Sequence, residues 1–421
     1  MSGMPRKSWL SLLLAPLFAM SAHSLAAQTP TIYQPEEPSA IFTAGVEYLI
    51  FTRDADISAP GNFIGGPDAG RLNFGSTEFD YTSGVRAFLA VSNDGVRVEG
   101  IYSNFGNFDY SASGSLTAGL SFDEGITGDW TGENFIDLTT GFSSLHGAAA
   151  SSMGGDTDEF EGLGPSATFA ADTLPTYDIF NKSSLEAWEL NVVSEDNTAF
   201  FQFGAGYSNV QLDESAGVAI RGTLRAVDNV GPNNGLSHGS LITFGNMTHM
   251  GGVADGFEDE LGNASGLADS MILAHSASTS NDLNGIQLIF RKEVMYWRGW
   301  VIDGTIKTGL YHNRSEGQVL QQFTGTDPGP GGDSSTYGRL FRDTDSGVAM
   351  SAAFALQSNF PLSERWSLLS GYEALLIHGV ALAPEQYQNV GGPTFVGQTY
   401  NVNNDGQIIA HGANVGLQFV Y

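Results

Sequence analysis

The chain has 421 residues, no cysteine and a formal net charge of −29. Without cysteine, a disulfide framework and thiol chemistry are excluded. The 17 Lys and Arg residues are dispersed along the sequence, which argues against a nucleic-acid partner, because phosphate contacts need clustered basic side chains.

The N-terminal residues predict a secretory signal peptide over residues 1–27. Arg6 and Lys7 form a short basic region, Trp9–Met20 is apolar apart from one serine, and Ser24–Ala26 offers small residues near a cleavage site. An N-terminal anchor helix is the alternative interpretation. After this segment no uninterrupted apolar run reaches the length of a membrane-spanning helix, so we expect no helical span. Residues 28–38 are expected to be a periplasmic segment.

Apolar residues then alternate with small or polar residues in paired segments, which is the pattern of half-buried β-strands. The first segment is Phe42–Ile50, and the next two, Val85–Val91 and Val96–Tyr102, flank the turn sequence NDG. We expect Val91 to lie opposite Val96. This register would place Glu99 diagonal to Arg86.

Further pairs of alternating segments follow along the chain. Trp188–Val192 and Phe201–Tyr207 flank SEDN, and pairing Val193 with Thr198 would place Trp188 opposite Phe203. The remaining expected strands contain Ile286–Phe290, Trp300–Ile306, Val348–Leu356, Trp366–Leu376 and the C-terminal segment.

The alternation of short and long connections predicts an all-β fold: a transmembrane, antiparallel, up-and-down β-barrel of about ten strands over residues 39–421. Short turns are expected on the periplasmic side and long acidic loops outside. A soluble sandwich is the alternative, but such long loops are unusual in one compact domain. Twelve strands would result if Gly217–Val227 also spans. The expected external loops are residues 54–82, 110–183, 213–283, 312–346 and 379–405.

The C-terminal sequence HGANVGLQFVY keeps a period of two up to its tyrosine. Such a strand resembles the C-terminal signature of Gram-negative outer-membrane barrels, which implies recognition by the β-barrel assembly machinery. Aromatic rings at this place suit the periplasmic lipid interface. The expected signature residues are Val415, Leu417, Phe419 and Tyr421.

Three stretches resemble the beta-barrel porin-7 family, which are outer-membrane proteins chiefly of planctomycete bacteria. They are FTAGVEYLIF at residues 42–51, GYEALLIHGVALAPEQ at 371–386 and HGANVGL at 411–417. The resemblance implies an outer-membrane barrel, and the family name implies a pore. A shared fold does not itself establish a function.

The strand faces opposite the apolar faces carry both acidic and basic residues, which we expect to line the lumen. A barrel of about eight strands is filled by its own side chains, whereas open porins have about sixteen. The charges therefore predict either a structural network of ion pairs or a selective conduit. They are Glu47, Arg86, Arg97, Glu99, Glu189, Arg291, Asp303, Lys307 and Glu373.

The expected loop 110–183 is strongly acidic, with eleven acidic residues and one basic residue. A cluster of four of them suggests a weak Ca²⁺ site, because hard cations prefer oxygen ligands, but its spacing lacks the order of an EF-hand loop. A solvated acidic loop is the simpler interpretation, so no cofactor is expected otherwise. The cluster consists of Asp156, Asp158, Glu159 and Glu161.

No motif of a hydrolase or zinc enzyme is present, so we expect no catalytic residues and no enzyme. Three functions stay open: a porin-like protein that passes small polar solutes or ions, a closed structural or adhesive barrel with cation-binding loops, and a surface hydrolase carried by a barrel. The expected partners are outer-membrane lipid, the assembly machinery and, for a pore, small polar solutes or cations.

Overall fold

A computed structural model describes most of the chain between residues 40 and 421. The described residues are 40–54, 68, 71–72, 74, 79–117, 120–123, 134–137, 169–171, 174–195, 201–226, 269–326, 334–391 and 399–421. The expected signal peptide at 1–27 and the segment 28–38 lie outside them. Within these ranges no helix is both long enough and apolar enough to cross a membrane.

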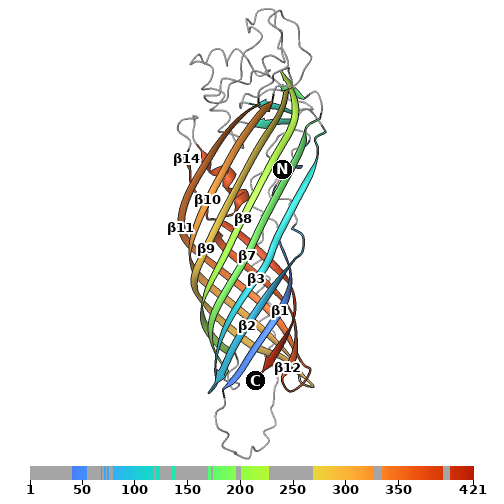
Figure 1. Ribbon diagram of the computed structural model, residues 1–421. Helices are drawn as coiled ribbons and strands as arrows, with labels where there is room; N and C mark the ends of the chain where they lie inside the picture. Colours follow the sequence, from blue (N-terminus) through green and yellow to red (C-terminus); the bar gives the residue numbers. More distant parts are fainter. Residues whose placement is uncertain are drawn as a thin grey trace, which may run out of the picture. The chain divides into compact units, whose positions relative to one another are not determined.

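Ten antiparallel strands form a closed barrel, because β8 pairs with β7 on one side and with β9 on the other (Figure 1). The predicted strand number and barrel class are thus confirmed. The barrel strands are β1 (Ile41–Arg53), β2 (Thr82–Asn93), β3 (Val96–Ser115), β7 (Thr176–Ser194), β8 (Gln202–Ala226), β9 (Asp269–Trp297), β10 (Trp300–Thr326), β11 (Ser334–Pro361), β12 (Trp366–Val380) and β15 (Gly406–Val420).

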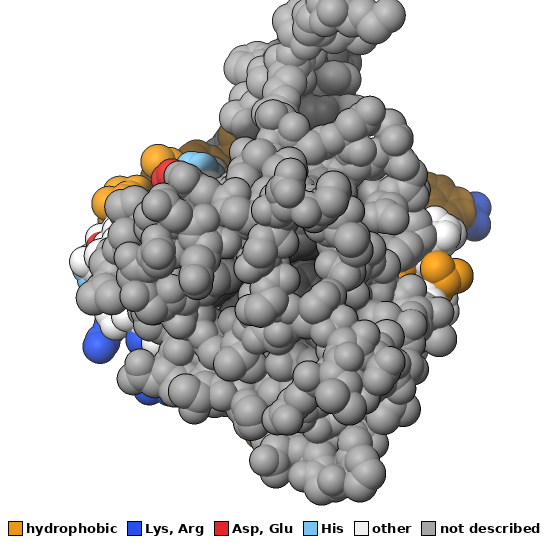
Figure 2. Space-filling model, turned by 90° about the horizontal axis from the view of Figure 1, so that it is seen from above, with side chains coloured by type: hydrophobic (Ala, Val, Ile, Leu, Met, Phe, Trp, Pro, Cys, Tyr) orange, Lys and Arg blue, Asp and Glu red, His pale blue; other side chains and the backbone are white. Residues whose placement is uncertain are grey.

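Alternation along each strand separates an outward apolar face from an inward face. On β2 and β7 the outward Leu89 and Leu190 are 69% and 54% exposed, whereas the inward Leu49 and Phe51 of β1 are completely buried. Hydrophobic side chains accordingly show at the periphery when the molecule is seen from above (Figure 2). A closed barrel with this apolar outer wall satisfies its backbone hydrogen bonds internally, as a membrane span requires.

The outward side chains become polar at a similar level on neighbouring strands, at Asn104, Glu186, Asn209 and His312. This level marks the external edge of the apolar wall. Strands β8, β9, β10 and β11 continue beyond it, since they are 25, 29, 27 and 28 residues long. The part of the barrel formed by β8 to β11 therefore extends farther outward than the part formed by β1 and β2, which have 13 and 12 residues.

Long strands correct three of the predicted loops. The range 312–346 is almost entirely strand, because β10 extends to Thr326 and β11 begins at Ser334. The ends of the predicted loops 213–283 and 110–183 likewise belong to β8 and β9 and to β3 and β7. Gly217–Ala226 continues β8 and adds no further span. Outside the bilayer both faces of a strand can be polar, so the apolar alternation that signals a span disappears.

The strand registers also differ from the predicted ones. Val91 pairs with Val98, because Asp94 and Gly95 close a two-residue turn with both φ values positive. Trp188 pairs with Asn209. Phe203 lies opposite Phe290 instead, with the ring centroids 5.3 Å apart.

The C-terminal strand β15 pairs with both β12 and β1 and so occupies a central place in the sheet. Val415 and Leu417 are exposed on the outward face as expected, and the ring of Phe419 lies 5.0 Å from that of Trp366. Tyr421 and Phe42 exchange two backbone hydrogen bonds. These contacts join the two ends of the described sheet at the side of the short turns (Figure 1).

Short elements lie between the barrel strands at the external side. They are β4 (Leu120–Asp123) and β5 (Asn134–Asp137), which pair in parallel, β6 (Phe169–Ala171), which pairs with β8, the 3₁₀-helix η5 (Ala383–Asn389), and the pair β13 (Val390–Gly391) and β14 (Thr399–Tyr400).

Candidate functional site

The lumen near the short turns contains a network of charged side chains from neighbouring and distant strands. Arg86 on β2 lies at one centre of this network. Its guanidinium donates to Glu47 at 3.3 Å, to Glu373 at 2.6 Å and to the Ser103 hydroxyl at 2.9 Å. Glu47 also accepts hydrogen bonds from Gln357 and Asn414. One cation therefore joins carboxylates from β1 and β12.

A second centre of the network is Glu99 on β3. Arg97 on the same strand donates to it at 3.2 Å, and Arg291 on β9 donates at 3.3 Å. Arg97 also lies 3.8 Å from Glu195 in the turn after β7. Glu99 is almost fully buried, so two cations compensate a carboxylate that has little access to water.

A third centre is Glu189 on β7. Lys307 on β10 donates to it at 2.7 Å, and Gln287 and Asn191 donate at 2.7 and 2.9 Å. Asn191 in turn accepts a hydrogen bond from Gln287 at 2.8 Å. Asp303 on β10 lies opposite Glu293 of β9, diagonal to Arg291. The other eight predicted lumen charges are joined to one another by ion pairs.

The predicted pairing within this set is wrong in one respect. Arg86 and Glu99 do not form the expected diagonal pair, because the observed register places Ser103 opposite Arg86 and Ala90 opposite Glu99. Each instead has one near partner, Glu47 on the neighbouring strand for Arg86 and Arg97 on the same strand for Glu99, and one partner on a more distant strand, Glu373 and Arg291 respectively. The sequence could identify the charges that face inward, but the partners depend on which strands curve toward one another.

Above the charges, an apolar layer fills the lumen. Fourteen of its sixteen buried residues come from nine of the ten barrel strands, and the other two are Phe79 before β2 and Leu382 after β12. The rings of Phe51 and Phe105 meet edge to face with centroids 5.0 Å apart. The layer comprises Leu49, Phe51, Phe79, Phe105, Phe108, Leu185, Val210, Leu212, Leu283, Tyr311, Ala349, Ile377, Val380, Leu382, Ile408 and Ala410.

A segment after β12 enters the barrel and covers this layer. We call residues 380–387 the plug. Gly379 has a φ of +88°, a conformation that suits glycine, and lies where the β12–β15 register shifts. Ala381, Leu382, Ala383 and Gln386 are completely buried. The predicted external loop 379–405 is therefore partly inside the barrel. Its first residues close the lumen on the external side.

The plug is anchored by hydrogen bonds to the long strands. Asn281 on β9 accepts from the Ala381 N–H and donates to the Ala381 carbonyl, both at 2.8 Å. The Tyr387 hydroxyl donates to the Ala216 carbonyl on β8 at 2.6 Å. The Tyr387 ring stacks on Phe74, with 5.6 Å between centroids. The backbone polar groups of an inserted segment need such partners, because no water competes for them there.

A buried ion pair joins the plug to two strands. Arg53 on β1 binds Glu214 on β8, and both side chains are essentially inaccessible. The other carboxylate oxygen of Glu214 accepts the Ala383 N–H at 3.0 Å. The Arg53 guanidinium also lies 5.0 Å from the centroid of the Phe79 ring. We call this arrangement the latch.

Sequence reasoning missed both the plug and the latch. Arg53 has the same parity as Glu47 on β1, which could have placed it in the lumen. Glu214 was assigned to an external loop. For the plug, the signal was composition: GVALA is apolar, whereas a solvated loop is usually rich in polar and turn-forming residues.

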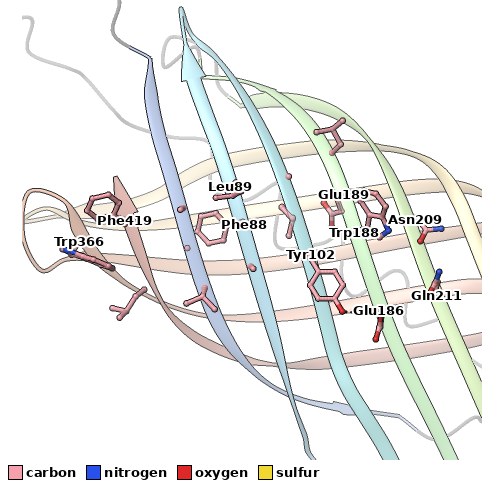
Figure 3. Close-up of a pocket in the computed structure, with 18 residues that line it drawn as sticks. Phe88, Leu89, Tyr102, Glu186, Trp188, Glu189, Asn209, Gln211, Trp366 and Phe419 are labelled. Carbon is pink, nitrogen blue, oxygen red and sulfur yellow. Dashed lines mark hydrogen bonds between the residues drawn. The ribbon is translucent and has the colours of Figure 1, made fainter. Parts of the chain in front are cut away.

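A groove of about 1050 Å³ lies on the wall formed by β1, β2, β3 and β7, with further lining residues from β8, β12 and β15 (Figure 3). Its large side chains, such as Leu89, Tyr102 and Trp188, are exposed residues of the outward apolar face. At its polar end Glu186 accepts hydrogen bonds from Tyr102 and Asn104 at 3.4 and 2.8 Å. Most of the groove belongs to the lipid-facing wall, and Glu189 of the lumen network also lines it.

Among the residues that the structure describes, no group of three or more His, Cys, Asp or Glu side chains is arranged to hold a metal ion. The candidate cluster of Asp156, Asp158, Glu159 and Glu161 lies outside the described residues, so the Ca²⁺ site stays a prediction. At the external side, burial and the nearby Asp343 carboxylate raise the pKa of Tyr400. This tyrosine is therefore a neutral hydrogen-bond donor, to Gln386 at 3.0 Å.

No family model matches the chain, and no curated protein matches it. The solved structures that it resembles include the outer membrane protease OmpT from Escherichia coli, at 7% identity and a TM-score of 0.34, over 91% of this chain and 97% of that one. The P. putida toluene transporter TodX follows at 7% identity, a TM-score of 0.18 and coverages of 90% and 89%. An anion-selective porin from Comamonas acidovorans matches at 10% identity, a TM-score of 0.14 and coverages of 91% and 100%. These likenesses are too distant to carry an argument about activity.

Proposed function

We propose that the protein is an outer-membrane β-barrel that is closed at rest and serves as a rigid support for its large external region. The observation that carries this proposal is the apolar layer, whose residues from nine strands meet inside the lumen beneath the plug. The membrane-spanning part is then a stable anchor, and the function lies outside it.

An apolar layer opposes ion passage for a physical reason. An ion that crosses it must give up its hydration shell without finding polar partners, and narrow hydrophobic constrictions close channels in this way. The charges below the layer are consistent with a structural role. Four carboxylates, Glu47, Glu99, Glu189 and Glu373, each lie within 3.3 Å of a Lys or Arg nitrogen.

The test is conductance of the full chain in a planar lipid bilayer. We expect no steady conductance from folded wild-type protein. A matched variant in which a Gly–Ser linker replaces residues 383–391 keeps the barrel strands and the apolar side chains of the wall. If this variant is also silent, the side-chain layer alone closes the lumen. Large, steady wild-type conductance contradicts the proposal.

A porin-like conduit that opens when the plug withdraws is the second candidate. The observation that favours it is the polar lining of the lower lumen, where mixed charges could select solutes. Under this alternative the wild type shows brief openings, and the linker variant conducts steadily. Substitution of Lys307 by Gln should then shift the cation-to-anion permeability ratio of the linker variant toward cations, because a lumen cation is removed.

We also propose, on the expectations from the sequence, that the chain is exported through its signal peptide, belongs with the beta-barrel porin-7 proteins of planctomycetes and has no enzymatic activity. Export predicts a mature N-terminus after residue 26 or 27, which N-terminal sequencing of the membrane fraction tests. Cation binding by the acidic external loops is a further proposed role of the closed barrel.

A further inference from the structure

Basic side chains gather over aromatic rings at one sector of the barrel end that bears the short turns. Arg298 forms the turn between β9 and β10, and its guanidinium carbon lies 5.1 Å from the centroid of the Trp297 ring. Arg365 precedes β12 and lies 5.8 Å from the ring centroid of Tyr421. Lys292 on β9 lies 5.4 Å from that of Phe201.

The two arginine-bearing turns are direct neighbours. A Cβ atom placed on Gly299 would lie 3.4 Å from the Pro361 side chain, so the two turns are in contact. The Trp300 and Phe360 rings meet edge to face with centroids 6.5 Å apart, and the Trp300 indole N–H donates to Ser358. Arg298 and Arg365 thus project from one continuous aromatic surface, which we call the rim sector.

Stacking on the aromatic rings prepares the arginines for an anion. A guanidinium over a ring face loses part of its rotational freedom before any ligand binds, while its N–H groups remain directed sideways. Arginine presents these donors in a planar fork that matches the oxygens of a phosphate. The sector is therefore preorganised for a phosphate group at the level of the ring plane.

The local charge of the rim sector is opposite to that of the whole chain. The protein carries −29 overall, yet the two turns of the rim sector, residues 298–299 and 362–365, contain two arginines, Arg298 and Arg365, and one acidic residue, Glu364. The residues that follow β2 and β7 include the acidic Asp94 and Glu195, and Glu195 lies 3.8 Å from Arg97. The two turns of the rim sector thus carry one more basic than acidic residue, next to Trp297, Trp300 and Trp366.

We propose that the rim sector binds the phosphate of an anionic phospholipid in the membrane leaflet that faces the short turns. Tryptophan and tyrosine side chains at a barrel end lie at the level of the lipid headgroups, so the two guanidinium groups meet phosphates that the bilayer itself supplies. A lipid brings acyl chains onto the neighbouring apolar wall as well, which a free phosphate ion lacks. The inference does not rest on the closed lumen and applies equally to an open barrel.

The test uses full-length protein in vesicles and the quenching of its tryptophan fluorescence by brominated lipids. Brominated phosphatidylglycerol is compared with brominated phosphatidylcholine, because both reach Trp297 and Trp300 but only the first is anionic. Each basic residue near an anionic membrane surface strengthens binding about fivefold. We expect wild-type protein to prefer phosphatidylglycerol several-fold, and the Arg298→Gln, Arg365→Gln double variant to lose most of this preference.

Three controls decide the outcome. The matched variant Arg314→Gln, Arg342→Gln removes two exposed arginines from the external part of β10 and β11 and should keep the wild-type preference. The double variant with lysine at positions 298 and 365 should keep most of it, which separates loss of charge from misfolding. Equal quenching by both lipids in the wild type, or an unchanged preference in the glutamine variant, overturns the proposal. Loss of the preference in inorganic phosphate, but not in chloride of equal ionic strength, assigns the site to free phosphate and also overturns it.

Discussion

The lower and upper halves of the lumen are filled in different ways. Below, long charged side chains such as Arg86 and Lys307 reach across the barrel and neutralise carboxylates from other strands. Above, apolar side chains and an inserted piece of main chain occupy the space, with the latch between Arg53 and Glu214 as the buried charge pair. The first half is filled by side chains alone, whereas the second needs a plug.

This difference follows from the unequal strands. Near the short turns all ten strands are present and paired, so the walls are close and side chains can meet. Farther up, β1, β2, β12 and β15 have ended while β8 to β11 continue, so the wall is incomplete there. The segment after β12, together with Phe74 and Phe79, supplies the missing apolar surface.

Breaking the latch should have the largest effect on the upper half. Glu214→Gln leaves Arg53 charged and buried without a carboxylate, which we expect to destabilise the barrel by about 3–5 kcal/mol. The double variant Arg53→Met, Glu214→Leu should lose much less. Urea unfolding in vesicles measures both. Since the chain lacks cysteine, Ala383→Cys adds a single thiol, which a maleimide should label faster in the Glu214→Gln background. Unchanged labelling would show that the latch does not hold the plug.

The outer wall offers a contrast to both halves, because it faces hydrocarbon. Leu190→Arg on β7 places a charge in lipid and should destabilise the barrel by about 2–4 kcal/mol. Leu190→Phe is the matched control and should fold like the wild type. Folding yield in vesicles, followed by heat-modifiable migration on gels, measures the effect. Equal yields for the two variants would contradict the assignment of this face.

Breaking the charge network should test the lower half alone. Arg86→Ala leaves Glu47 and Glu373 without their shared cation, at an expected cost of about 2–3 kcal/mol, below that of a fully buried pair because Arg86 has some contact with solvent. The barrel should nevertheless stay silent in bilayer recordings, since the apolar layer above is intact. Conductance in Arg86→Ala would place the barrier in the charges and not in the layer.

The smallest change concerns the point where the chain turns into the lumen. Gly379→Ala removes no hydrogen-bonding group but places a Cβ at φ of +88°, 2.6 Å from the Val348 carbonyl oxygen. We expect a destabilisation of about 1–2 kcal/mol and faster labelling of a thiol at position 383. Gly347→Ala on β11 is the control, because a Cβ there meets only Asn404, at 3.9 Å. Equal unfolding midpoints for the two alanine variants would contradict a special role for Gly379.

The sequence was sufficient to predict which face of each strand points inward, but not the pairing between strands. The predicted register is displaced by two residues at Val91 and by six at Trp188, relative to the observed partners Val98 and Asn209. Both displacements are even, so each side chain keeps its face. For this reason charges such as Arg86 and Glu99 keep the face predicted for them and join the ion-pair network, while the Arg86–Glu99 pair was wrong.

The contacts of the plug and the latch could not be predicted from the sequence for a different reason. Arg53 and Glu214 are 161 positions apart, and the Ala383 contact adds a third distant segment. No local pattern reports such a meeting, since it depends on the closure of the whole sheet. The external ends of β10 and β11 were missed because alternation of apolar residues ceases where lipid no longer covers the wall.

The position of the plug within the chain has a consequence for assembly. It lies between β12 and β15, and β15 forms the seam with β1, where Ala44 pairs with Phe419 across nearly the whole length of the sequence. Contacts between such distant residues form late, since they carry the largest loop-closure cost. The hairpin of β12 and β15 that closes the barrel therefore also carries the plug. Closure of the sheet and filling of the lumen thus belong to one folding step. A barrel that failed to insert residues 380–387 would face that final step with an unfilled interior.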